Sequence, residues 1–311
     1  MSSASTPALP ALQGATVGAL VAAGARLLEA AGVSFGHGTT NARDEAAWLV
    51  LWRLGLPLDS PLGPDTDSIE NRPVAPTDQA LVATLFEERI RSRKPAAYLT
   101  HEAWLQGVPF YVDERAIVPR SLIAELIADG GFDDFLGAHT RRVLDLCTGN
   151  GSLAVLAAMA WPEIHIDAAD LSDDALAVAR INVERHGLQH RIRLLHSDGL
   201  AACPGPYDLI VCNPPYVNAA SMAQLPPEYR AEPTLALAGG VDGMDFIRRL
   251  LREAPARMSE HAVLVLEIGN ERAHLEAAFP ALPVFWLDTS AGDEQVLLIE
   301  RAALSCFSLP E

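Results

Sequence analysis

From residue 142 to residue 300, short apolar runs typical of buried strands alternate with segments of helical periodicity. Strands separated by helices run parallel, because a parallel return needs a crossover of a dozen residues or more. A parallel sheet must then be covered by helices on both faces. The sequence therefore predicts an α/β fold with strands at 143–146, 164–169, 192–196, 209–212 and 263–267, followed by 284–287 and 295–300. The last two are joined by so short a turn that they must be antiparallel.

The N-terminal third has a different pattern. Apolar residues recur at helical spacing in about 15–32, 42–54 and 78–94, and two short runs at 98–104 and 108–112 are typical of a hairpin. We therefore expect a helical domain with a disordered N-terminal tail at 1–96, a β-hairpin linker at 97–119, the α/β domain at 120–302 and a tail at 303–311.

The charge is unevenly distributed. The chain has 40 acidic and 23 basic side chains, a formal net charge of −17. Residues 98–311 hold 30 acidic and 15 basic side chains, whereas residues 1–97 hold 10 and 8. This balance argues against a protein whose main partner is a bare phosphate backbone, because that attraction needs clustered Lys and Arg. The one basic cluster, Arg89 to Lys94, either serves the dipole of a helix end or contacts a nucleic acid or an acidic surface.

Cysteine use and hydropathy exclude further classes. The four cysteines, Cys147, Cys203, Cys212 and Cys306, form no C-x-x-C pair, so we expect neither a disulfide framework nor a metal site. No run reaches the roughly 20 apolar residues that span a bilayer. No basic segment precedes the early apolar stretch, so a signal peptide is not expected. We expect a cytoplasmic protein without a membrane partner.

A loop with two glycines separates the first predicted strand from its helix. It contains Asp145, Thr148, Gly149 and Gly151. Glycine lets the backbone turn tightly and approach a ligand, and the helix behind it offers unpaired N–H groups. A dinucleotide would place its diphosphate there. Asp145 would repel a diphosphate, and its carboxylate suits a cofactor that carries a cationic group.

Two further carboxylates follow the next strands. Asp170 is placed to accept hydrogen bonds from both hydroxyls of a ribose, and Asp198 is placed to meet an adenine. Adenine, ribose and a cationic amino-acid tail together describe S-adenosylmethionine, and we count Thr148 among the residues that bind it. Each acid alone could be a strand-end cap. The set at consecutive strand ends, where open α/β sheets bind ligands, favours the cofactor.

The reaction is expected at Asn213-Pro214-Pro215-Tyr216, after the fourth strand. The prolines fix φ and remove two backbone donors, so that carbonyls point outward as acceptors. The Asn213 side-chain oxygen and the Pro214 carbonyl could then grip the two hydrogens of an –NH2 group, while Tyr216 offers an aromatic face. The tetrapeptide alone could be a structural turn. After a buried strand of this sheet it favours methyl transfer to a planar nitrogen, with Asn213, Pro214 and Tyr216 catalytic and all four residues binding substrate.

With these two motifs the chain resembles the class I, Rossmann-like methyltransferases that use S-adenosylmethionine and act on planar nitrogen. The helical N-terminal part, the hairpin and Val118-Pro119-Arg120 are similar to those of the bacterial protein-glutamine N(5)-methyltransferases. So are the stretches Glu232-Pro233, 237–245 and 266–270. The resemblance covers about residues 16–302. It implies a mainly parallel seven-stranded sheet with an antiparallel last strand, and a small helical N-terminal domain that recognises the substrate.

Three stretches, 35–46, 119–127 and 225–230, resemble the branch that methylates a glutamine of large-subunit ribosomal protein L-three. The release-factor branch typically has Pro-Arg-Pro-Asp-Thr-Glu where this chain has Pro119-Arg120-Ser121. The resemblance implies that Asp170 binds the cofactor ribose, that Asn213 contacts both the cofactor and the substrate amide, and that Pro214 to Tyr216 frame the glutamine.

Four other residues have less certain roles. His37 is expected in a loop or cap. Cys147, where many methyltransferases have glycine, and Cys212 are expected to be small buried residues. Glu267 is either a cap or an acid on the cofactor side.

The predicted reaction is methyl transfer to a glutamine side-chain amide of L-three, free or in an assembly intermediate. Three alternatives remain: the same reaction on the Gly-Gly-Gln glutamine of peptide-chain release factors, a nucleic-acid amino methyltransferase, and a noncatalytic ribosome-assembly factor. The acidity of the catalytic part weighs against nucleic acid, and no sequence-specific nucleic-acid binding is expected. The intact glycine loop and Asn-Pro-Pro-Tyr turn weigh against a noncatalytic factor.

Overall fold

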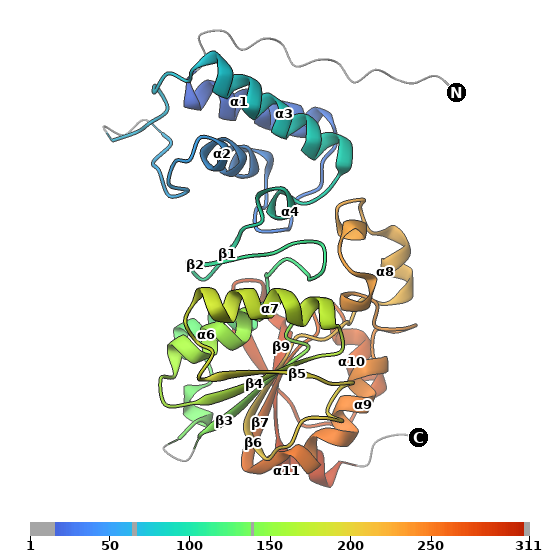
Figure 1. Ribbon diagram of the computed structural model, residues 1–311. Coiled ribbons are helices and arrows are strands. Elements are labelled where there is room, and N and C mark those ends of the chain that lie inside the picture. Colours follow the sequence, from blue (N-terminus) through green and yellow to red (C-terminus); the bar gives the residue numbers. More distant parts are fainter. Residues whose placement is uncertain (1–15, 64–66, 138–139, 308–311) are drawn as a thin grey trace. The chain divides into compact units, whose positions relative to one another are not determined.

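The computed structural model describes residues 16–63, 67–137 and 140–307, and the expected N-terminal tail lies outside these ranges. The chain forms two compact units (Figure 1). The helical unit consists of the described residues up to Thr100 together with Pro226–Ala231. The sheet unit consists of His101–Leu225 and the described residues from Glu232 onward. The predicted domain boundaries placed 226–231 in the α/β domain, so the return of this segment to the helical unit is a feature that only the structure reveals.

The helical unit contains α1 (Val17–Ala30), α2 (Ala42–Arg53), α3 (Pro76–Ser92) and α4 (Ala96–Thr100). Two of these helices begin at a capping side chain, because Thr16 Oγ1 accepts the N–H of Ala19 and Asn41 Oδ1 accepts the N–H of Asp44. The apolar faces of α1, α2 and α3 pack into one core. Gly24 lies in this core, where a Cβ would come within 2.1 Å of the Phe86 ring. A glycine in mid-helix is thus explained by the close approach of α3.

The predicted strand at 98–104 is wrong in its first part. Residues 96–100 form α4, and strand pairing begins only with β1 (Ala103–Leu105), which is antiparallel to β2 (Val108–Phe110). The two alanines after Pro95 favour a helix start more than Tyr98 favours a strand. The hairpin turns at Gln106 and Gly107, which both have positive φ (49° and 71°), as a two-residue turn of the primed type requires.

The sheet unit is built on one seven-stranded sheet with the order β5-β4-β3-β6-β7-β9-β8 (Figure 1). The strands are β3 (Arg142–Leu146), β4 (His165–Asp170), β5 (Ile192–His196), β6 (Tyr207–Cys212), β7 (Met258–Glu267), β8 (Phe285–Thr289) and β9 (Gly292–Glu300). The first five in the sheet order are parallel, and β9 is antiparallel to both of its neighbours. The predicted fold class is therefore confirmed.

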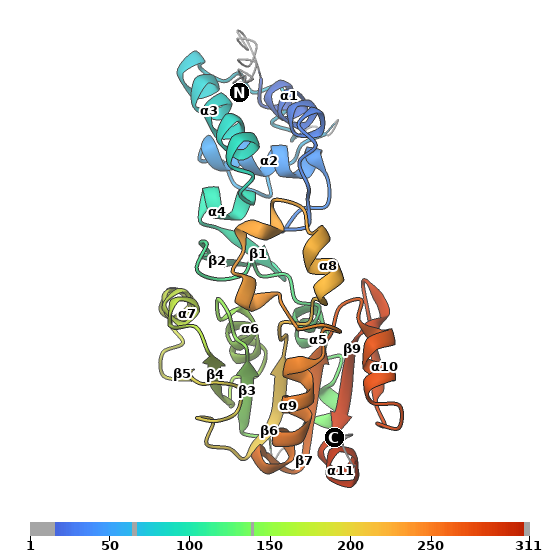
Figure 2. The ribbon, with the colours of Figure 1, turned by 90° about the vertical axis from the view of Figure 1, so that its right-hand side faces the viewer.

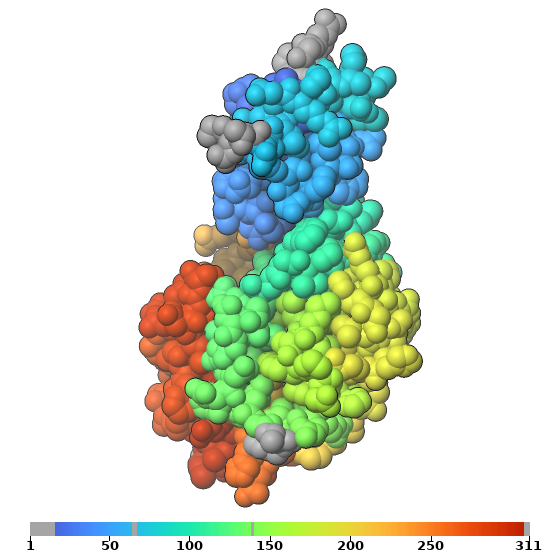
Figure 3. All heavy atoms as spheres, turned by 90° about the vertical axis from the view of Figure 1, so that its left-hand side faces the viewer, coloured from blue at the N-terminus to red at the C-terminus, as the bar shows by residue number. Residues whose placement is uncertain are grey.

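Helices cover both faces of this sheet, and alternate residues of each strand point to opposite faces. Val143 belongs to the core under α5, α6 and α7, and Leu144 to the core under α9, α10 and α11 (Figure 2). Figure 3 shows α5, α6 and α7 side by side on one surface of the sheet unit. The helices of this unit are α5 (Ile123–Asp129), α6 (Ser152–Ala160), α7 (Asp173–Arg185), α8 (Ala219–Gln224), α9 (Asp245–Glu253), α10 (Arg272–Ala278) and α11 (Arg301–Cys306). Short 3-10 turns lie at 133–135, 229–231, 234–236 and 254–257.

Helices α8, α10 and α11 have only six or seven residues each, too few for helical periodicity to be recognised in the sequence. Helix α11 occupies the start of the predicted tail at 303–311, where buried Leu304 fixes it to the core. Within the described ranges, no helix combines the length and apolar character needed to cross a membrane.

The contact between Gly24 and Phe86 gives a test of the helical core. Gly24→Ala should lower the free energy of unfolding by about 1–3 kcal/mol, because the added methyl overlaps the Phe86 ring. Helix propensity alone predicts the opposite, a gain of about 1 kcal/mol. Urea denaturation measures the difference, and adding Phe86→Leu should recover part of the loss. A Gly24→Ala protein more stable than the parent would contradict this packing.

Candidate active site

The parallel strands bring the predicted site residues to one edge of the sheet. Leu146 at the end of β3 pairs with Ala169 of β4 on one side and with Cys212 of β6 on the other. The residues that follow these three positions are the glycine loop, Asp170 and Asn213, so they are neighbours in space. This carboxyl edge is where open α/β sheets bind ligands.

The carboxylate of Asp145 is buried under the glycine loop and is 1% exposed. Its Oδ2 accepts a hydrogen bond from the Thr148 hydroxyl at 2.5 Å and another from the Ala154 N–H at 3.0 Å. Its Oδ1 is buried and has no hydrogen-bond partner among the described residues. Burial raises the pKa of Asp145 to about 7, against the effect of its two hydrogen bonds. The carboxylate is therefore poised to ionise when a cation arrives beside Oδ1.

Thr148 is one of the predicted cofactor-binding residues. In the structure the Thr148 hydroxyl donates a hydrogen bond to Asp145, and Thr148 is only 6% exposed. Its backbone N–H donates to the Ala169 carbonyl at 3.0 Å. Thr148 thus orients Asp145, and a direct contact of Thr148 with the cofactor stays a prediction.

The loop turns by means of residues in the left-handed region. Gly149 has φ 56° and Gly151 φ 82°. At Gly151 a second constraint applies, because a Cβ would lie 3.1 Å from the Cβ of Ala179 in α7. Gly149 therefore serves the turn, and Gly151 serves both the turn and the packing of α6 on α7.

The two cysteines at this edge differ in role. Cys147 also has a left-handed φ of 62°, a conformation that glycine adopts with less strain than any other residue. Cys147 is half-buried, so the predicted burial is only partly right. Cys212 is fully buried, and burial raises the pKa of its thiol well above the ordinary value. Its thiol stays protonated and packs in the core.

Asp170 and Asp198 have different surroundings. Asp170 accepts the N–H of Gly149 and the N–H of Ser172, both at 2.9 Å, so it holds the glycine loop against the end of β4. Burial raises the pKa of Asp170. Asp198 is exposed and forms an ion pair with Arg249 at 2.6 Å, which lowers the pKa of Asp198. A contact of Asp198 with adenine stays a prediction, and any such contact is shared with Arg249.

The turn Asn213–Tyr216 follows β6, and three glycines enclose its last residue. A Cβ on Gly239 would lie 2.7 Å from the Tyr216 Cα, one on Gly243 2.2 Å from the Tyr216 carbonyl oxygen, and one on Gly269 2.6 Å from the Tyr216 ring. No side chain larger than hydrogen fits at these points. The Asn213 side chain has no hydrogen-bond partner among the described residues, so its amide is available for a ligand.

Two side-chain pairs join segments far apart in sequence. Arg120 forms a bidentate ion pair with Glu232 at 2.6 and 2.7 Å, and Glu232 also accepts the Val118 N–H. Glu267 accepts the Ser121 hydroxyl at 2.5 Å, and burial raises the pKa of this carboxyl. Glu267 thus caps the segment before α5. Sequence reasoning missed the role of Glu232, because no local pattern links it to an arginine 112 residues away.

Comparison with known proteins decides the family. Residues 132–225 match the family described as Methyltransferase small domain. The ribosomal protein uL3 glutamine methyltransferase of Bordetella pertussis is 52% identical over 282 residues, which cover 89% of this chain and 92% of that protein. That of Burkholderia pseudomallei is 52% identical over 285 residues, covering 88% and 90%. The chain belongs to the family of ribosomal protein uL3 glutamine methyltransferases.

The family predicted from the two motifs is therefore confirmed. Among solved structures, the catalytic domain of hMettl16 in complex with a hairpin of the MAT2A 3′UTR aligns with a TM-score of 0.50. It is 16% identical and covers 75% of this chain and 84% of that one. This likeness concerns the fold alone.

The basic cluster at the C-terminal end of α3 is mostly structural. Arg89 is 0% exposed and pairs with Glu45 at 2.8 Å and with Glu228 at 3.4 Å. Arg93 also pairs with Glu228, at 2.8 Å. Arg91 is exposed and pairs with Glu88. The sequence predicted that these basic residues either serve the dipole of the helix end or contact a nucleic acid or an acidic surface. The main role of Arg89 and Arg93 is instead to form ion pairs with buried acids, one of which, Glu228, lies in the segment Pro226–Ala231.

His37 lies in the loop between α1 and α2, as expected, but its side chain is buried. It is 1% exposed, and its ring lies 4.2 Å from the ring of Tyr229, measured between centroids. Gly36 has φ 123°, and a Cβ there would lie 2.3 Å from the Tyr229 hydroxyl. Two stretches that resemble the same family branch, 35–46 and 225–230, therefore pack on each other inside the helical unit.

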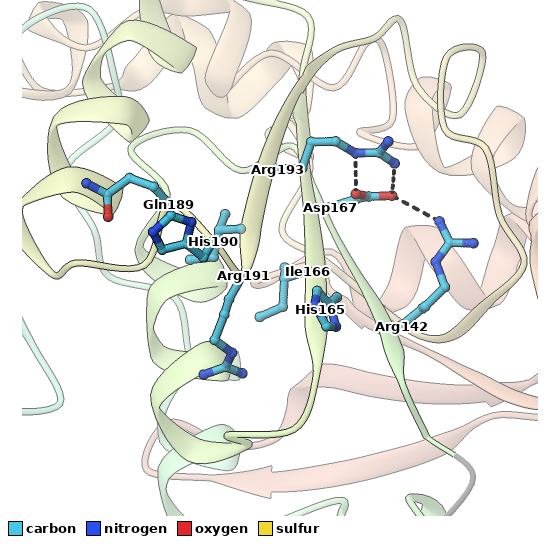
Figure 4. A pocket seen from close by; sticks show the side chains of 9 residues that line it. Arg142, His165, Ile166, Asp167, Gln189, His190, Arg191 and Arg193 are labelled. Atoms are coloured by element: carbon cyan, nitrogen blue, oxygen red, sulfur yellow. Dashed lines mark hydrogen bonds and ion pairs between the residues drawn. The ribbon is translucent and has the colours of Figure 1, made fainter.

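A hollow at the amino edge of the sheet lies away from these residues (Figure 4). Asp167 of β4 binds Arg193 through two hydrogen bonds of 2.8 and 2.7 Å and contacts Arg142 at 3.3 Å. The Tyr207 hydroxyl also donates to Asp167, at 2.7 Å. The charge of Asp167 on β4 is thus balanced by arginines on the neighbouring strands β5 and β3. The hollow thus owes its polarity to a structural ion cluster.

The enclosure of Tyr216 leads to a prediction with a matched control. Gly243→Ala should reduce methyl transfer at least tenfold, because its Cβ displaces the Tyr216 carbonyl and with it the catalytic turn. Gly187→Ala places alanine at a similar left-handed φ with nothing within 4 Å. Both variants should lose about 1 kcal/mol of stability from backbone strain, Gly243→Ala should lose more because of the overlap, and at a temperature where both are fully folded only Gly243→Ala should lose activity. Equal rates in the two variants, measured by transfer of labelled methyl, would refute the importance of this contact.

Proposed function

We propose that this chain transfers the methyl group of S-adenosylmethionine to the side-chain amide nitrogen of a glutamine in ribosomal protein uL3. The observation that carries the proposal is that two polar groups near the carboxyl edge of the sheet have no hydrogen-bond partner among the described residues. One is the buried Oδ1 of Asp145, and the other is the side-chain amide of Asn213. The names of its relatives at about half identity support the substrate.

The residues of the glycine loop fit S-adenosylmethionine. The Oδ1 of Asp145 would accept a hydrogen bond from the ammonium group, which removes the cost of a buried carboxylate oxygen without a partner. Asp170 already accepts two backbone N–H groups and retains lone pairs for the ribose hydroxyls. Gly149, which has no Cβ, would let the cofactor approach the backbone closely. When bound, the cofactor supplies an electrophilic methyl group on a sulfonium centre.

The turn after β6 would orient the acceptor. An amide nitrogen is a poor nucleophile because its lone pair is delocalised into the carbonyl group. The Asn213 side-chain oxygen and the Pro214 carbonyl would hold the two N–H bonds of the glutamine, and Tyr216 would support its planar group. Fixed orientation then places the nitrogen toward the methyl group, and catalysis comes from positioning and electrostatics. The nitrogen can lose its proton after transfer, so the turn needs no strong base.

The observations favour uL3 over the alternative substrates. The chain has Ser121 where the release-factor branch has proline, and the Ser121 hydroxyl binds Glu267. A nucleic-acid substrate would need exposed cations, and the basic residues Arg89 and Arg93 are committed to ion pairs in the helical unit. A ribosomal protein that binds RNA phosphates is itself basic, and residues 98–311 carry most of the acidic excess. We infer that the substrate is uL3 free in the cytoplasm or in an assembly intermediate, before RNA covers it.

The reaction and its substrate can be tested together. The purified protein should transfer labelled methyl from S-adenosylmethionine to uL3, and Asn213→Ala should abolish this transfer because the amide is no longer gripped. Cofactor affinity, measured by isothermal titration calorimetry, should stay within about threefold of the parent, since Asp145 and Asp170 remain in place.

Release factor, ribosomal RNA and mature ribosomes serve as competing acceptors in the same assay. Label in release factor or RNA in place of uL3 would overturn the substrate. Better labelling of mature ribosomes than of free uL3 would overturn the timing. A near-normal rate for Asn213→Ala would overturn the grip on the amide.

Cofactor binding should depend on pH. Because the pKa of Asp145 is raised to about 7 in the ligand-free protein, the fraction able to pair with an ammonium group increases as the pH rises through this value. The affinity for S-adenosylmethionine should increase several-fold between about pH 6 and about pH 7.5, where an α-amino group remains mostly protonated. Asp145→Asn should bind more weakly and without this increase. A parent affinity that is constant over the range would contradict the pairing.

A further inference from the structure

Two cysteines lie at the carboxyl edge of the sheet, at the ends of neighbouring parallel strands. Cys147 directly follows β3, and Cys212 is the last residue of the adjacent strand β6 (Figure 2). Cys212 pairs in register with Leu146. Neighbouring strands lie about 4.8 Å apart and consecutive Cα atoms about 3.8 Å apart, so the Cα atoms of Cys147 and Cys212 are separated by roughly 6 Å. A disulfide bond spans such a separation.

The backbone conformation of Cys147 turns its side chain toward Cys212. Leu146 and Cys212 both point into the core under α9, α10 and α11. Along a regular strand the next residue, Cys147, would point to the opposite face of the sheet. Its φ of 62° breaks this alternation, and its side chain packs against the same core. A hydrogen bond links the two thiols, so the sulfur atoms are in contact.

This conformation is unfavourable for a residue that carries a Cβ. A left-handed φ brings the Cβ close to the following carbonyl oxygen, and residues held in this way concentrate at functional sites. The same loop uses glycine for its other left-handed positions, Gly149 and Gly151. A thiol at position 147 therefore adds strain without serving the turn, and what it gains is the contact with Cys212.

The two thiols differ in their access to solvent. Cys147 is half-buried, whereas Cys212 is 0% exposed. Burial, the Cys147 thiol and the nearby carboxyl groups of Asp145 and Asp170 raise the pKa of Cys212, so its thiol stays protonated. An oxidant from solvent therefore meets Cys147 first, and Cys212 can react only with the sulfur beside it.

We propose that Cys147 and Cys212 form an oxidation site, which a peroxide converts to a disulfide bond between the glycine loop and the catalytic turn. The Cys147 sulfur attacks one oxygen of hydrogen peroxide, the O–O bond breaks, and the leaving oxygen takes the thiol proton to become water. The resulting sulfenic acid condenses with a thiol. The Cys212 sulfur attacks the Cys147 sulfur, the S–O bond breaks, and the hydroxyl group leaves with the Cys212 proton as a second water molecule.

The disulfide would connect the two parts of the site. Cys147 lies in the loop that contains Asp145 and Gly149, and Cys212 directly precedes Asn213. A disulfide holds its sulfur atoms about 2.05 Å apart, closer than two hydrogen-bonded thiols, so the loop and the turn are drawn together. Because methyl transfer depends on exact positioning, the linked form should be inactive until a reductant opens it. This consequence rests on the proposed function, whereas the formation of the disulfide does not.

The disulfide is tested by mass spectrometry on the full chain. After treatment with hydrogen peroxide, the remaining thiols are blocked with iodoacetamide and the protein is digested without reductant. The parent should give the peptides of Cys147 and Cys212 joined, with two hydrogens lost. Cys306→Ser removes an exposed thiol and is the matched control, which should give the same link. A parent without this link, or with Cys147 joined to Cys203 of the same core, overturns the oxidation site.

Transfer of labelled methyl to uL3 tests the consequence for the site. Peroxide should lower the rate of the parent and of Cys306→Ser by about tenfold or more, and dithiothreitol should restore both rates. Cys147→Gly, which also relieves the left-handed φ, and Cys212→Ala should each stay within about twofold of their own untreated rate. Comparison with the untreated sample of the same variant separates oxidation from any change in basal activity.

The outcomes separate the two claims. A parent that does not methylate uL3 before treatment overturns the proposed function, and the peptide map still decides the oxidation site. A parent that forms the link without losing activity overturns the effect of the disulfide on the site. Loss of activity that dithiothreitol does not reverse, or that persists in Cys147→Gly, overturns the disulfide as its cause.

Discussion

The parallel register of β3, β4 and β6 is the constraint on which the site depends. It places the ends of three strands at one edge of the sheet. The glycine loop, Asp170 and Asn213 therefore become neighbours, although they are spread over residues 145–213 of the sequence. Asp170 then ties β4 to the glycine loop through the Gly149 N–H. The carboxyl groups that hold the loop are also the ones proposed to bind the cofactor. Structure and ligand recognition therefore cannot be separated at this edge.

The catalytic turn depends on space left by other segments. Tyr216 is enclosed by Gly239 and Gly243, which precede α9, and by Gly269, which follows β7. Prolines stiffen the turn locally, but its position is set by these contacts and by the pairing of Val217 with the segment 237–239. The glycines at 239, 243 and 269 are thus as much a part of the site as the residues that would touch the substrate.

Much of this architecture is predictable from sequence because it follows from local pattern. Strands β3 to β7 and helices α6, α7 and α9 have apolar periodicity or capping residues that identify them, and the strand-end acids follow from the topology. The failures have a different cause. Arg89 looks like the charged end of a helix until its partner Glu228 is known, and Arg120 has no visible partner until Glu232 is brought to it. Pairs between distant segments leave no periodic signal, and α4 shows that two alanines after a proline can outweigh an aromatic residue.

These pairs also change the meaning of the net charge of −17. Several acids are buried and do not contribute to an attractive surface field, among them Glu45, Asp145, Asp167, Glu228, Glu232 and Glu267. Most of them are matched by an arginine or by backbone and hydroxyl donors, and Asp145 alone keeps a raised pKa near neutrality with one oxygen unpaired. A carboxyl group that is costly to ionise in the empty site becomes stable when a cation pairs with it. Glu228 also has one buried oxygen without a partner, but two arginines balance its charge, so Asp145 is the acid of this group that a cationic cofactor would complete. A basic substrate would be attracted by the acids that remain exposed.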